Sequence, residues 1–84
     1  MMAQMLMDAP DELRNFLVSR LIHIVHSTFL NDEEEIIKAK NEMKLKCPIL
    51  TDDIIDKAVT LNINKHTDPI LIVEKWLKGD SQKN

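Results

Sequence analysis

Hydrophobic residues recur at helical spacing through the first third of this chain. Between residues 10 and 30 they cover an arc of about half the circumference of a helix. That arc holds Leu13, Leu17, Val18, Leu21, Ile22, Ile24, Val25 and Phe29. The opposite stripe holds Glu12, Asn15, Ser19, Arg20, His23, His26 and Ser27. An arc this wide predicts a central helix that packs against more than one neighbour.

Capping signals place the start of this helix and of the next. Asp8 followed by Pro10 is typical of a first turn, so the pattern predicts a helix over about 10–30. A second helix is predicted over 32–45, with Asn31 or Asp32 as its cap, acids in its first turn and lysines near its end. Its apolar seam is narrow and leaves Ile37 outside. The seam consists of Ile36, Ala39 and Met43.

Two shorter helices follow the break at Pro48. Thr51 predicts the start of a helix over 52–62, and residues 62–66 read as a polar connection. Thr67 or Asp68, with Pro69 in the first turn and Gly79 as the stop, predicts a helix over 69–78. The expected core face of the third helix is Ile54, Ile55, Ala58, Val59 and Leu61. The expected face of the fourth is Ile70, Val73, Trp76 and Leu77, with Ile72 at its edge.

Residues 70–73 also suit a short strand, but the caps and the length of the segment favour a helix. The chain is therefore expected to be all-α, a single small four-helix bundle-like domain over residues 1–84. A Met-rich head (residues 1–8) precedes the helices, and residues 80–84 are expected to be a loose tail. With 84 residues the chain can support only one core.

Composition narrows the classes of function. The formal net charge is −3, the basic residues are scattered, and Phe16, Phe29 and Trp76 are the only aromatic residues, which argues against nucleic-acid binding. The single cysteine, Cys47, cannot form an internal disulfide. No apolar stretch approaches the ~20 residues of a membrane span, and the head lacks the basic start of a signal peptide. We therefore expect a cytoplasmic protein without a membrane partner.

Candidate chemistry is sparse. His23 and His26 are three residues apart on a predicted helix and could bind one metal ion together with Cys47 or His66. Both histidines lie on the polar stripe, however, and the sequence contains no further ligand pattern that supports a metal site. Cys47, between apolar neighbours, reads as a core residue rather than a nucleophile. With Gly79 as the only glycine, no phosphate-binding loop exists. We expect no enzyme activity, no metal and no cofactor.

The Lys75-Trp76 pair, late in a capped helix, resembles a feature of the small helical domains that dock on transcription elongation factors. The likeness covers about a third of the chain. The glycine that this family places in the turn between its helices is absent, so the chain is not assigned to that family.

The expected function is therefore protein binding, as a small adaptor, regulator or inhibitor. Apolar residues in excess of the core predict the contact surface: Met5 and Met7 in the head, Ile37 and Leu71 on the helices. Homodimerisation through the head or the broad face of the first helix is a second expectation. The alternative is a nucleic-acid or transcription-associated helical module that uses the basic stripe of Arg14, Arg20, His23 and His26.

Overall fold

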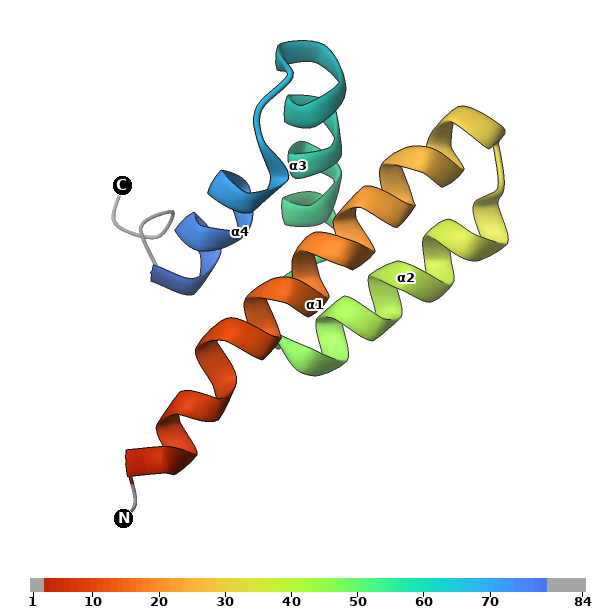
Figure 1. Ribbon diagram of the computed structural model, residues 1–84. Helices are drawn as coiled ribbons and strands as arrows, with labels where there is room; N and C mark the ends of the chain where they lie inside the picture. Colours follow the sequence, from red (N-terminus) through yellow and green to blue (C-terminus); the bar gives the residue numbers. More distant parts are fainter. Residues whose placement is uncertain (1–2, 79–84) are drawn as a thin grey trace.

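The computed structural model describes the backbone of residues 3–78 and the side chains of residues 11–78, so the predicted tail over 80–84 lies outside the described residues. This part of the chain is all helix and turn (Figure 1). The helices are α1 (Ala3–Leu30), α2 (Glu33–Lys46), α3 (Asp52–Lys65) and α4 (Pro69–Lys78). The all-α fold is confirmed, and residues 70–73 are helical rather than a strand.

Helix α1 is the centre of the structure. Helix α2 folds back along it, while α3 and α4 pack on α1 more than on each other. The capping residues predicted from the sequence begin three of the helices. Asp32 accepts a hydrogen bond from the backbone N–H of Glu35, and Thr51 accepts one from Ile54. Asp68 does the same for Ile70.

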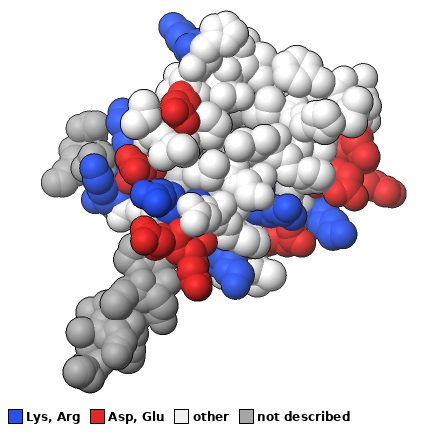
Figure 2. Space-filling model, in the orientation of Figure 1, with Lys and Arg blue, Asp and Glu red and all other residues white. Residues whose placement is uncertain are grey.

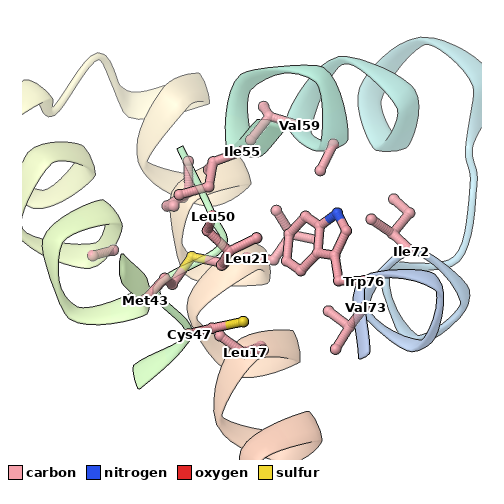
Figure 3. Packing of buried hydrophobic residues seen from close by; sticks show 13 residues of the cluster. Leu17, Leu21, Met43, Cys47, Leu50, Ile55, Val59, Ile72, Val73 and Trp76 are labelled. Carbon is pink, nitrogen blue, oxygen red and sulfur yellow. The ribbon is translucent and has the colours of Figure 1, made fainter. Parts of the chain in front are cut away.

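The buried core collects apolar side chains from every helix and from the connection between α2 and α3 (Figure 3). Its members are Leu17, Leu21, Ile24, Ala39, Met43, Cys47, Leu50, Ile55, Ala58, Val59, Ile72, Val73 and Trp76. Helix α2 contributes Ala39 and Met43 and leaves Ile37 outside, as its narrow seam predicts. Trp76 is 6 % exposed, so its expected place in the core is confirmed.

Two helices are longer than the sequence predicts. Helix α1 begins at Ala3, so Pro10 lies within the helix and not in its first turn, where the capping pattern predicts it. Helix α3 runs on to Lys65 instead of stopping at residue 62. His66 ends it in the left-handed conformation, and the Asn62 side chain donates to the carbonyl oxygen of Thr67 over 2.9 Å. The polar residues of this stretch therefore form the last turn of a helix.

Two predicted faces also need correction. In α4, Ile72 is buried, while Ile70 and Leu77 are exposed, because α1 and α3 cover a different side of the helix from the one that periodicity selects. In α1, Ser27 belongs to the predicted polar stripe but is buried. The backbone N–H of Asp32 donates to the carbonyl oxygen of Ser27 over 2.9 Å, so the chain reversal into α2 encloses this residue.

Candidate protein-binding groove

An apolar groove of about 480 Å³ lies between α3 and α4 and is closed at one side by the connection that precedes α3. Its floor consists of core residues: Leu50, Ala58, Ile72 and Trp76. The groove remains open because α3 and α4 are both held by α1 and contact each other little. Core residues are therefore accessible from the surface between α3 and α4, because no further helix covers them here.

The walls of the groove carry large apolar side chains that the core does not use. Leu61 projects from α3, Leu71 from α4 and Ile49 from the connection, and their exposed fractions are 41 %, 56 % and 47 %. Isolated exposed apolar residues are common on protein surfaces. Three of them around one hollow, above a buried tryptophan, form a contiguous patch of the kind that marks an interaction site.

Polar groups in the groove have one sign of charge. Lys57 on α3 and Lys75 on α4 line it, and no aspartate or glutamate does so among the described residues. Neither lysine forms an ion pair with a described residue, whereas Lys40 and Lys44 are paired with Asp56 and Asp52 on the α2–α3 side. The groove is thus apolar within and basic at its sides.

Trp76 adds a hydrogen-bond donor to the floor. Its ring lies between α3 and α4 in Figure 3, with the indole nitrogen on the side of α3. The indole N–H makes no hydrogen bond to a residue that the structure describes. Buried tryptophan N–H groups usually find a partner, so this donor is available to a group that enters the groove.

The four contact residues predicted from the sequence do not form one site. Leu71 is a wall of the groove. Ile37 is 58 % exposed, as predicted, but lies on α2 beside Lys40 and Asp56, in a separate shallow depression. The side chains of Met5 and Met7 lie outside the described residues. Two wall residues were not predicted as contact residues. Leu61 has the helical period of the core face of α3, and Ile49 lies outside any periodic segment.

The candidate metal ligands do not gather. His23 Nε2 lies 3.0 Å from Glu35 Oε1 on α2, and this hydrogen bond is the main reason that the pKa of Glu35 is lowered. His26 is exposed. Over the described residues, no three His, Cys, Asp or Glu side chains are grouped as a metal would need. Cys47 is buried in the core, as predicted, and its burial raises the pKa of the thiol.

The two arginines of the basic stripe on α1 are paired with acids of α1 itself, of α2 and of α4. Arg14 Nη1 lies 3.4 Å from Glu74 on α4, and Arg14 Nη2 lies 3.6 Å from Asp11. Arg20 Nη1 lies 2.8 Å from Glu42 on α2. A phosphate would have to compete with these carboxylates for each arginine, which disfavours anion binding along this stripe.

No family model, curated protein or solved structure matches this chain. Among the described helices, none is both long enough and apolar enough to span a membrane. The interpretation of function therefore depends on the surface of the molecule itself.

Proposed function

We propose that this protein is a small cytoplasmic adaptor or regulator that binds another protein by accepting an amphipathic helix in the groove between α3 and α4. The observation that carries the proposal is the set of exposed walls, Leu61 and Leu71, above the buried Trp76. An apolar helix face laid into an apolar groove is a recurrent mode of peptide recognition.

The spacing of the wall residues suits a helix as the occupant. Ile54 and Leu61 lie seven residues apart on α3, about two helical turns, and form a ridge along one side of the groove. Leu71 and Lys75 are four apart on α4 and form the facing ridge. Ridges of this kind pack into the grooves between side chains of a third helix.

The charges of the groove favour an acidic partner. Lys57 and Lys75 stand on opposite sides, so a helix between them gains ion pairs when acidic residues flank its apolar face. Such rim charges affect the choice of partner and the rate of association more than the affinity. Basic helices are disfavoured by the same two lysines.

A display selection tests the proposal. The library encodes amphipathic helices of about four turns. Their apolar face varies among Leu, Ile, Met and Phe, and their flanking positions vary equally among Glu, Lys, Gln and Ser. We expect the full chain to enrich helices with Glu at the flanks. The double variant K57E/K75E should reverse this preference towards Lys.

Matched variants locate the binding site. Leu71→Glu should abolish enrichment, because it places a charge on the groove wall, whereas Ile37→Glu changes an equally exposed isoleucine on another helix and should leave it intact. Binding that survives Leu71→Glu, or an absence of enrichment by the native chain, would contradict the proposal. Enrichment of helices without a preference for Glu at the flanks would support the groove as the binding site but contradict the proposed acidic partner.

The alternative of a nucleic-acid or transcription-associated module stays a prediction. It requires affinity for nucleic acid that falls steeply with salt. The carboxylates paired with Arg14 and Arg20 favour the protein-binding function instead.

A further inference from the structure

Helix α1 has a second apolar row that the core covers only in part. Its core residues Leu17, Leu21 and Ile24 occupy one side of the wide hydrophobic arc. The other side carries a row that we call the α1 ridge, and it consists of Val18, Ile22, Val25 and Phe29. Ile22 is 51 % exposed and Phe29 67 %, whereas the two valines are half-buried and pack against the core with their inner sides.

The α1 ridge has the spacing of a helix-pairing seam. Its residues are separated by four, three and four positions, which is the a/d pattern of two helices that pack side by side. Ile70 of α4 lies beside it, since Ile70, Val18 and Ile22 line the same shallow depression. The apolar surface therefore extends from α1 onto α4.

Charge on this face lies at its two ends: Arg14 lines the depression that holds Val18 and Ile22, and Asp68 lines the one that holds Phe29. From Leu21 to Leu30, α1 contains no lysine, arginine, aspartate or glutamate. Figure 2 shows the consequence, because the surface over the C-terminal half of α1 and the adjoining end of α3 is nearly free of charged groups. The charged side chains of this view lie mainly around its edges and over the N-terminal half of α1.

We propose that a second copy of this chain covers the α1 ridge, with the two α1 helices packed against each other about a two-fold axis. In a two-fold interface the same patch meets itself, so a patch that carries charge of only one sign is repelled by its copy. An uncharged apolar ridge avoids that repulsion. The basic groove between α3 and α4 lacks this self-complementarity and stays free for another partner.

Residue sizes along the ridge favour an antiparallel pair. Antiparallel pairing about its centre sets Ile22 against Val25 of the second copy, and the small Val18 against the large Phe29. Parallel pairing would oppose Phe29 to Phe29 and Val18 to Val18, which leaves crowding at one end and a gap at the other. It would also bring Asp11 close to Asp11 of the second copy.

Sedimentation equilibrium of the full chain, from low to high micromolar concentration, tests the proposal. We expect a reversible monomer–dimer equilibrium that Ile22→Glu and Phe29→Glu each weaken by roughly tenfold or more, with unchanged helical circular dichroism, since both residues are exposed. Ile37→Glu is the matched control and should dimerise like the native chain. A chain that stays monomeric throughout, or a dimer that survives both ridge variants, would overturn the proposal.

Cysteine cross-linking tests the orientation. In a Cys47→Ala background, single variants Val18→Cys and Phe29→Cys are oxidised separately and as a mixture, and the products are separated by mass. We expect the mixed disulfide between positions 18 and 29 to dominate. Dominance of 18–18 and 29–29 disulfides would overturn the antiparallel arrangement. A dimer that is lost on Leu71→Glu alone would place the second copy in the groove instead.

Discussion

Two neighbouring residues of α1 distinguish its core side from its ridge. Leu21 is 0 % exposed and lies among core residues of the other helices, whereas Ile22, the next residue, is 51 % exposed. Leu21→Ala removes side-chain atoms from a closed core, and Leu→Ala changes of this kind cost about 2.7–5 kcal/mol. A domain of this size has a free energy of unfolding of roughly 5–10 kcal/mol, so about half of it should be lost.

Ile22→Ala removes the same number of side-chain atoms but at a half-exposed position. Its cost should stay below about 1 kcal/mol, because little buried area is lost and alanine has the higher helix propensity. The comparison needs low protein concentration, so that dimerisation does not add to the stability of the native chain. The two variants then differ by about 2 kcal/mol or more.

Urea unfolding provides the assay. Far-UV circular dichroism reports the helices, and fluorescence reports Trp76, the only tryptophan of the chain. The Leu21→Ala midpoint should fall far below that of Ile22→Ala, while both variants keep the native dependence on urea concentration. Equal losses for the two variants, or a larger loss for Ile22→Ala, would refute the assignment of the core and ridge sides of α1.

Two further predictions concern the ends of α3. His66 has φ 57° and ψ 32°, a left-handed conformation that glycine adopts at less cost than other residues. His66→Gly should therefore raise the free energy of unfolding by about 0.5–1 kcal/mol, whereas His66→Ala should not. Equal effects of the two changes would contradict this prediction. Lys44 Nζ lies 2.8 Å from Asp52 and lowers the pKa of that carboxyl from its ordinary 3.8. This contribution is fully present above the unfolded pKa and is lost as the pH falls through the lower folded value, so Lys44→Gln should be less stable than the native chain at about pH 6 and equal to it at about pH 2. A difference in urea midpoint that does not change with pH would contradict it.

The helices and their caps could be predicted from the sequence because they depend on nearby residues. Asp32, Thr51 and Asp68 cap the helices as local chemistry suggests, and the single narrow seam of α2 left no choice about its buried face. In α4, four consecutive apolar residues precede Glu74, so periodicity could not decide between Ile70 and Ile72. The positions of α1 and α3 make that choice.

The groove could not be predicted, because it depends on how α3 and α4 sit on α1 rather than on either helix alone. Leu71 was correctly identified as surplus to the core face of its own helix. Leu61 was not predicted as a contact residue because it has the right period for the core of α3, yet it is 41 % exposed at the groove. The exposed half of the α1 arc could not be predicted either. A wide apolar arc indicates that a helix has several neighbours, but it does not show how many residues of the arc those neighbours cover.

The most direct test of the central claim is an NMR titration of the full chain with an acidic helix from the display selection. Because the chain has one tryptophan, its indole N–H gives a single side-chain signal at the floor of the groove. We expect this signal to shift together with the amides of Leu61 and Leu71, and the amide of Ile22 on the α1 ridge to stay unmoved. Saturable binding that leaves the Trp76 indole signal unmoved, or that shifts Ile22 instead, would contradict the assignment of the groove as the binding site.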